Sequence, residues 1–228
     1  MDVLHEKLTK IKEIRYRMKK IMFNDRYGLT QAVIEGRKTM TRRLEFDDKL
    51  QKIIADSDSY YYDDGYLVFA TQGVDIHHVK TRYKIGELIA IAESYFYVRN
   101  IVVGQEYDDR LCKAYRIEHT DDVVKLAGWS NKEFVHADLM LHRIRITGIK
   151  CERLQDISDE DCFYEGIIES WYESTDTTTY GYADEKKWTA VEFDTPREAF
   201  ASLIDKISGK GTWERNPWVV VYEFELVK

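Results

Sequence analysis

Strand-like and helix-like patterns follow one another in an irregular order along this chain, and that order constrains its fold more than any other feature. Residues 142–151 alternate isoleucines with basic residues, which is typical of a long strand with one buried face, bent near Gly148. Residues 196–207 begin with Pro196 and repeat apolar side chains at helical spacing. Because strands and helices do not alternate regularly, a doubly wound parallel sheet is not expected. The sequence predicts an α+β fold, and a small, mainly antiparallel sheet decorated by helices fits this order.

The remaining predicted elements are short. Strands are expected at residues 21–23, 39–46, 66–71, 87–98 and 219–227, a helix at 26–35, and another opening at Ser158 with a capping-box-like pattern. The acidic, tyrosine-rich stretch 56–65 is predicted to be a hairpin tip or loop. Leu and Ile at three- and four-residue spacing predict an amphipathic helix at 3–20. We therefore expect an appended helix at 1–20 and a single domain at 21–228, with a polar loop insertion near 172–188.

Composition narrows the class of protein. The chain has 228 residues, 44% of them hydrophobic and only two of them prolines, which favours one domain with a sizeable core. No apolar run approaches a membrane-spanning length and no signal peptide is visible, so we expect a cytoplasmic protein without a membrane partner. Three cysteines without a C-x-x-C pair fit a reducing compartment. The pair His77-His78 has no further ligands near it in the sequence, so neither a metal nor another cofactor is expected.

The charge of the chain is distributed unevenly. The net charge is −7, but residues 1–43 hold twelve Lys or Arg against five Asp or Glu, a balance of +7, which leaves −14 for residues 44–228. Such asymmetry can mark a basic face that binds phosphates. The alternative is that the basic N-terminal segment packs on the acidic body. Single-stranded nucleic acid therefore stays a candidate partner, and the oligomeric state is undetermined.

The segment Gly36–Arg43 concentrates one glycine, two threonines and four cations in eight residues. Gly36 suits the left-handed position that ends a helix, and the Thr-Met-Thr that follows has strand character. Lys38 and Thr41 are therefore expected at a helix-to-strand corner. Backbone amides and cations there can face a phosphate, a nucleotide or an oxyanion, with Arg37, Arg42 and Arg43 as ligand-binding candidates. The alternative is a solvated basic turn.

Four segments together resemble a known superfamily. The pattern Gly-Arg-Lys-Thr-x-Thr-x-Arg at residues 36–43 is similar to the signature of ASCH domains, a branch of the PUA-like fold. Residues 83–88, 153–167 and 216–219 resemble three further family segments in the same order, so the resemblance covers roughly residues 21 to 227. The similarity is greatest to ASCH proteins of phages and prophages. It implies a PUA-like β-barrel decorated by helices, with nucleoside, nucleotide or RNA as ligand.

The resemblance also implies a catalytic set. A small bacterial ASCH enzyme, the acetylcytidine amidohydrolase, is distantly similar, and its proposed catalytic residues match Lys38, Thr41 and, by position, Glu165. A threonine hydroxyl needs a base, a desolvated lysine can serve as one, and a carboxylate can move the proton. These groups suffice in principle for amide hydrolysis without a metal. Glu160 and Asp161 are the rival carboxylates, and an exposed surface carboxylate is the plainer interpretation of Glu165.

Three more residues are ligand-binding candidates. Glu93 is preceded by Ala92, whereas the phage-type pattern usually has an arginine before this glutamate. Glu93 itself is expected either to face the pocket or to pair with a cation. Asn216 and Trp218 precede the closing strand, where aromatics beside amides can stack on and read a base. The alternative for the tryptophan is a core position.

Three functions remain open from the sequence. The first is hydrolysis of an acylated nucleobase, and the second is binding of a nucleoside, nucleotide or RNA without turnover. They differ in whether the Lys38 amine is desolvated beside Thr41 and a carboxylate. The third is a phage-encoded protein-interaction module without catalysis, which would expose an apolar patch, for example on the helix predicted at 3–20.

Overall fold

The computed structural model describes residues 18–101, 104–185 and 189–227. The chain divides into two compact units. The larger unit combines Met22–Leu88 with His142–Lys228, and the smaller combines Met1–Ile21 with Ile89–Leu141. The helix predicted at 3–20 falls mostly on residues 1–17, which lie outside the described residues. The sequence analysis expected a single domain at residues 21–228 and did not predict this division.

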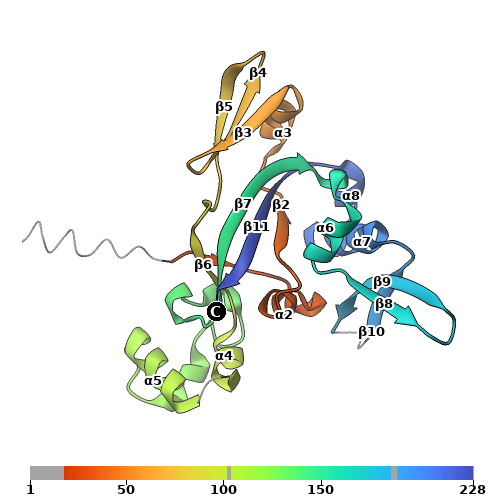
Figure 1. Ribbon diagram of the computed structural model, residues 1–228. Coiled ribbons are helices and arrows are strands. Elements are labelled where there is room, and N and C mark those ends of the chain that lie inside the picture. The colour runs from red at the N-terminus through yellow and green to blue at the C-terminus, as the bar shows by residue number, and fades with distance from the viewer. Residues whose placement is uncertain (1–17, 102–103, 186–188, 228) are drawn as a thin grey trace, which may run out of the picture. The chain divides into compact units, whose positions relative to one another are not determined.

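Three antiparallel neighbours form the centre of the larger unit (Figure 1). They are β2 (Met40–Arg43), β7 (Arg143–Arg153) and β11 (Trp218–Val227), with β11 between the other two. Ile144 and Ile146 are fully buried, which confirms that one face of this strand packs inward. The β7–β11 register shifts between Glu223 and Phe224, opposite Gly148, so the expected irregularity near this glycine is present.

Helices α6 (Asp159–Tyr164), α7 (Pro196–Ser208) and α8 (Thr212–Arg215) belong to the same unit. The Ser158 hydroxyl accepts a hydrogen bond from the Asp161 N–H at 3.0 Å, which confirms the predicted N-cap of α6. Thr195 caps α7 in the same way, and Pro196 occupies its first turn. A 3-10 turn, η5 (Leu154–Asp156), connects β7 to the α6 region.

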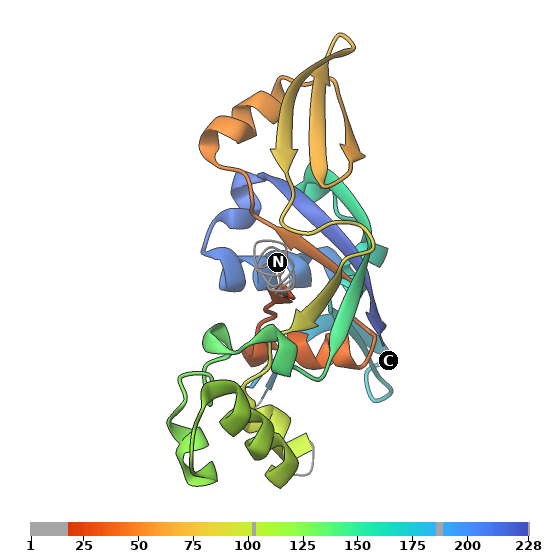
Figure 2. The same ribbon diagram turned by 90° about the vertical axis from the view of Figure 1, so that its left-hand side faces the viewer.

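Two further antiparallel sheets lie at the edges of this unit. One contains β3 (Ser59–Asp63), β4 (Tyr66–Thr71) and β5 (Val74–Lys80), and α3 (Asp48–Ala55) lies beside it in both ribbon views (Figure 2). The other contains β8 (Ile168–Tyr172), β9 (Thr177–Asp184) and β10 (Thr189–Phe193).

These edge sheets correct two sequence predictions. Residues 56–65 were expected to form a hairpin tip or loop; Asp64 and Gly65 do form the tip between β3 and β4, but the tyrosines before them lie in β3, paired with β4. Residues 172–188 were expected to be a polar loop insertion, but Thr177 begins β9, which pairs on both sides. The physical reason is the same in both places. β-branched and aromatic residues favour a pleated surface even where the segment is polar overall.

The smaller unit has an aromatic core. β1 (Lys20–Ile21) pairs in parallel with β6 (Leu88–Ile91), whose residues from Ile89 on belong to this unit. Helices α4 (Tyr95–Ile101) and α5 (Gly104–Tyr115) follow, with the 3-10 turns η2 (Thr120–Lys125), η3 (Lys132–Phe134) and η4 (Ala137–Leu139). The strand predicted at 87–98 is therefore too long. Tyr95 instead begins α4, and its ring packs in the buried cluster with Tyr107 and Leu111.

The mixture of helices with separate, mostly antiparallel sheets agrees with the α+β class. Among the described residues the strands form open sheets, and none of these sheets closes into a barrel. The PUA-like assignment therefore stays a prediction.

The N-cap of α6 gives a test of the fold. Ser158→Ala removes the acceptor for the Asp161 N–H and should lower the free energy of unfolding by about 1 kcal/mol. Ser158→Asn keeps a side-chain oxygen at the cap and should unfold close to wild type. Urea unfolding followed by circular dichroism measures both, and equal losses in the two variants would contradict the cap.

Candidate functional site

The segment Gly36–Arg43 forms the helix-to-strand corner that its sequence predicted. Helix α2 (Leu29–Ile34) follows the 3-10 turn η1 (Asp25–Tyr27), and Gly36 ends it with a φ of +76°. The backbone N–H of Lys38 then donates to Ala32 O at 3.0 Å, and β2 begins two residues later. The chain thus turns sharply enough to point the Lys38 side chain into the unit.

A cavity of about 330 Å³ lies at this corner, within the larger unit. Its volume is at the lower end of the range for small-molecule sites. The sequence-predicted residues on its wall come from the corner, β2 and the end of α6, and they are Lys38, Thr41, Arg42, Arg43 and Glu165.

Lys38 and Glu165 form a buried ion pair in this cavity. The Lys38 Nζ lies 2.6 Å from Glu165 Oε2 and also donates to the backbone oxygens of Met40 and Glu165, at 2.7 and 2.8 Å. Lys38 is only 2% exposed. Burial lowers the pKa of the Lys38 amine, and the Glu165 carboxylate partly offsets that shift. The prediction that these two residues converge is borne out in the structure, although 127 positions separate them.

Gly166 makes this close approach possible. It follows the C-cap of α6 with a φ of +105°, a conformation that favours glycine. A Cβ at this position would lie 3.1 Å from the Leu29 side chain and 3.6 Å from that of Lys38. The turn therefore lets Glu165 and the corner pack directly against each other.

Thr41 lies on the same cavity wall, in β2 opposite Tyr222 of β11. The residue is buried, yet its hydroxyl makes no hydrogen bond to any residue that the structure describes. A hydroxyl on a cavity wall without a partner is available to a ligand. All three members of the predicted catalytic set thus line one cavity.

Arg42 holds the carboxylates of the site together. Its guanidinium is fully buried, with Nη2 at 2.5 Å from Asp161 Oδ2 and 2.6 Å from Glu152 Oε1, and with Nη1 at 3.2 Å from Glu165 Oε1. Arg42 was expected to bind the ligand, but its donors are occupied by three carboxylates. Asp161, a rival for the catalytic role, belongs to this cluster, whereas Glu160 accepts a surface hydrogen bond from Tyr164.

Arg43, unlike Arg42, has a side-chain donor without a hydrogen-bond partner among the described residues. Its Nη2 donates to Met22 O at 2.8 Å, while its buried Nε has no hydrogen-bond partner among the described residues. The guanidinium carbon lies 5.6 Å from the centre of the Phe23 ring. Burial lowers the pKa of this arginine. An unpaired buried donor costs free energy, about 1–3 kcal/mol.

Four predicted ligand-binding residues lie elsewhere. Arg37 is exposed and pairs with Glu35 on the surface. The Asn216 side chain accepts from the Gln155 N–H, and the Trp218 ring stacks with Arg153 at 4.7 Å. None of these three lines the cavity.

The fourth residue, Glu93, is buried in the smaller unit, where its backbone N–H lies 3.2 Å from Met140 Sδ.

The sequence analysis missed several residues that line the cavity. Phe23 and Glu45 line it from strands that were predicted, and Asn24 and Arg82 line it from segments between predicted elements. The apolar side chains of α7, among them Leu203 and Ile207, also line it. Their helical spacing was recognised, but spacing alone does not distinguish a face that packs in the core from one that borders a cavity.

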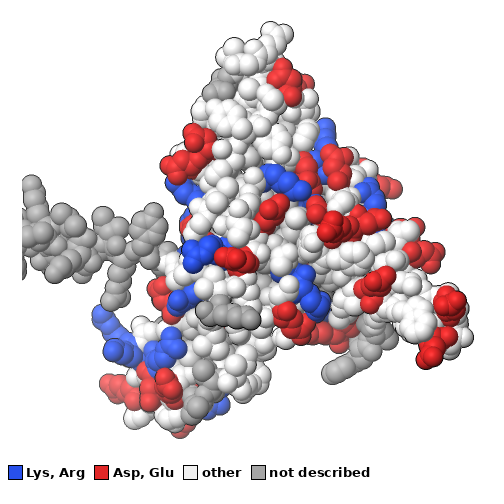
Figure 3. Space-filling model, in the orientation of Figure 1, with Lys and Arg blue, Asp and Glu red and all other residues white. Residues whose placement is uncertain are grey.

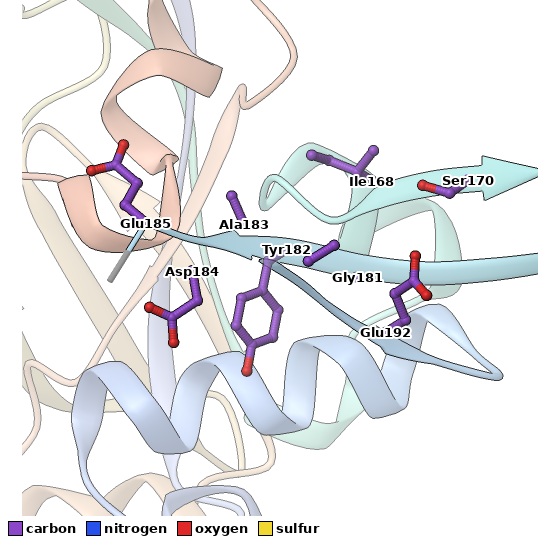
Figure 4. A pocket seen from close by; sticks show the side chains of 9 residues that line it. Ile168, Ser170, Gly181, Tyr182, Ala183, Asp184, Glu185 and Glu192 are labelled. Atoms are coloured by element: carbon purple, nitrogen blue, oxygen red, sulfur yellow. The ribbon is translucent and has the colours of Figure 1, made fainter. Parts of the chain in front are cut away.

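A second cavity, of about 320 Å³, lies over β8, β9 and β10 (Figure 4). Two of its three carboxylates are already engaged. Asp184 forms a bidentate pair with Arg26, and Glu192 accepts from the Tyr172 hydroxyl. Tyr182 points away, toward α7, where its hydroxyl meets Ser202. This cavity brings together no set of groups comparable to the one around Lys38.

Acidic side chains gather over β8 and β9 in the view of Figure 3. That part of the surface repels phosphate rather than attracting it. Among the described residues no group of three His, Cys, Asp or Glu is arranged to hold a metal ion. No described helix has both the length and the apolar character needed to cross a membrane.

No protein-family model, curated protein or solved structure matches this chain. The resemblance to ASCH domains therefore stays a prediction from the motifs.

The buried ion pair gives a second test. Glu165→Gln should lower the free energy of unfolding by about 3–5 kcal/mol, because Lys38 is left charged and buried without a counter-ion. The matched control is Glu35→Gln, which breaks the exposed pair with Arg37 and should leave the unfolding midpoint close to wild type. Thermal or urea unfolding measures both. Similar midpoints for the two variants would show that the Lys38–Glu165 pair is not buried as described.

Proposed function

We propose that the cavity binds a nucleoside acylated on its base and hydrolyses the amide. One observation carries the proposal: a buried lysine–carboxylate pair, 2.6 Å apart, shares a cavity with the Thr41 hydroxyl, which makes no hydrogen bond to the residues that the structure describes. The resemblance of residues 36–43 to the ASCH signature supports the choice of an acylated nucleobase. Burial lowers the pKa of the lysine, as a base working near neutral pH requires.

The proposed reaction moves one proton at a time. Lys38 passes a proton to Glu165 and becomes neutral, and then takes the proton of the Thr41 hydroxyl as Oγ1 attacks the amide carbon. The C–N bond breaks, and the leaving amine receives a proton from the Lys38–Glu165 pair. Water then hydrolyses the acyl ester on Thr41, which releases a carboxylic acid and restores the hydroxyl. The balance is amide plus water giving amine plus acid.

Arg43 supplies a donor for oxygen on the substrate. Arg43 lines the cavity, and its Nε has no hydrogen-bond partner among the described residues. A positive donor near the carbonyl would also stabilise the negative charge that develops there.

The cavity favours a small ligand over a polynucleotide. Arg42 forms ion pairs with three carboxylates, and Arg37 pairs with Glu35 on the surface. The surface over β8 and β9 is acidic. Few cations of the corner are then left for phosphates of a long strand. The helix at 3–20, given as an example of an apolar patch for a protein-interaction module, lies mostly outside the described residues.

Binding without turnover is the second candidate, and one observation favours it. The three protons of the Lys38 ammonium have three acceptors, Met40 O, Glu165 O and Glu165 Oε2. A lysine fixed in this way can serve as a structural cation that shapes the corner.

Thr41 decides between the two candidates. Wild-type protein should convert N4-acetylcytidine to cytidine, and Thr41→Ala should abolish release because the nucleophile is lost. The matched control is Thr39→Ala, two residues away and not on the cavity wall. Chromatography of the nucleosides measures turnover, and calorimetry on Thr41→Ala measures binding.

Each outcome of this experiment is informative. Hydrolysis that persists in Thr41→Ala would exclude the threonine as nucleophile. Saturable binding without turnover in the wild type would replace the hydrolase by the binder. Neither binding nor turnover across a panel of acylated nucleosides would overturn both.

The pH dependence tests Lys38. Because burial lowers the pKa of this amine, the deprotonated base should form below the ordinary lysine value of about 10.4. We expect kcat/KM to rise with pH and to reach half its maximum below that value. Lys38→Arg, which stays charged, should show no such rise. A wild-type profile that rises only near the ordinary lysine pKa would contradict a desolvated base.

A further inference from the structure

The cavity at the corner has two chemically different walls. One carries the polar groups of Lys38, Thr41, Arg43 and Glu165. The other wall is apolar and comes from α7. Residues 200, 203, 204 and 207 of this helix follow the spacing of a single apolar stripe. An acetyl group has one methyl, which needs little apolar wall.

The apolar side of the cavity continues beyond the core. Phe200, Leu203 and Ile204 are buried, but Ile207, at the end of the same stripe, is 40% exposed. Met22 and Leu44 line the same cavity and are 41% and 44% exposed. Three large apolar side chains, from three separate segments, are therefore exposed around one cavity.

These apolar side chains are connected to the polar wall. The backbone oxygen of Met22 accepts the hydrogen bond from Arg43 Nη2, and Leu44 directly follows Arg43 in the chain. Arg43, a cation on the cavity wall, thus contacts the backbone of one exposed apolar residue and is followed in the chain by another. This arrangement suits a carbonyl that carries an apolar chain.

We propose that the acyl group removed at this site is an apolar chain of four or more carbons, which lies against Met22, Leu44 and Ile207. This inference rests on the proposed hydrolysis and adds the class of substrate. A chain in this position would cover apolar surface that is otherwise exposed to water. Each methylene that it buries should tighten binding about fourfold.

A series of N4-acyl cytidines tests the proposal. The acetyl, butanoyl and hexanoyl compounds are compared as substrates of the wild type by kcat/KM, and as ligands of Thr41→Ala by calorimetry. We expect both kcat/KM and affinity to rise from acetyl to butanoyl by about tenfold or more. Ile207→Ser and Leu44→Ser should flatten this rise, because each variant removes apolar surface that only the longer chains cover.

The matched control is Trp171→Ser. Trp171 is 61% exposed in the same unit and does not line the cavity, so its removal should leave the dependence on chain length intact. Circular dichroism establishes that each variant is folded.

The outcomes separate the inference from the function on which it rests. Turnover that is equal for all chain lengths, or highest for acetyl, overturns the inference and leaves the hydrolase. Affinity that rises with chain length without any turnover upholds the apolar subsite and overturns hydrolysis. Absence of binding at every chain length overturns both.

Discussion

The buried charge cluster around Glu165 is the interaction on which the corner depends. One carboxylate meets Lys38 on one oxygen and Arg42 on the other, and both cations lie away from water. Burying charges is costly unless each has a partner, so the cluster is stable only when α6, β2 and the turn at Gly166 are all in place. The shape of the cavity wall therefore depends on all three of these elements. What holds the site together is thus charge pairing, while apolar packing by α7 closes it.

Local signals predicted much of the larger unit. The N-cap at Ser158, the left-handed Gly36 and the alternating isoleucines of β7 each rest on rules that act within a few residues, and each was found. The convergence of Lys38, Thr41 and Glu165 was expected from motif resemblance rather than from physical spacing. The two edge sheets were missed in part because polar composition was given more weight than β-branched and aromatic content.

The rest of the site could not be predicted because it depends on contacts that are distant in sequence. Arg42 and Arg43 are neighbours with the same side chain, yet Arg42 is bound by three carboxylates, while Arg43 has an Nε without a partner among the described residues. No pattern in residues 36–43 distinguishes them. Similarly, Ile207 and Leu203 share one helical stripe, but only the structure separates the exposed residue from the buried one.

The position of β11 between β7 and β2 has a consequence for how the protein is made. On the ribosome β2 emerges early, but its partner strand is synthesised about 180 residues later, since Arg43 pairs with Val220. Until then the edge of β2 is unpaired, and the cations of the corner remain in water. Strands this distant in sequence pair slowly, because the long intervening segment loses conformational entropy before any strand contact compensates for that loss. The corner is therefore assembled among the last parts of the molecule, after translation has passed β11.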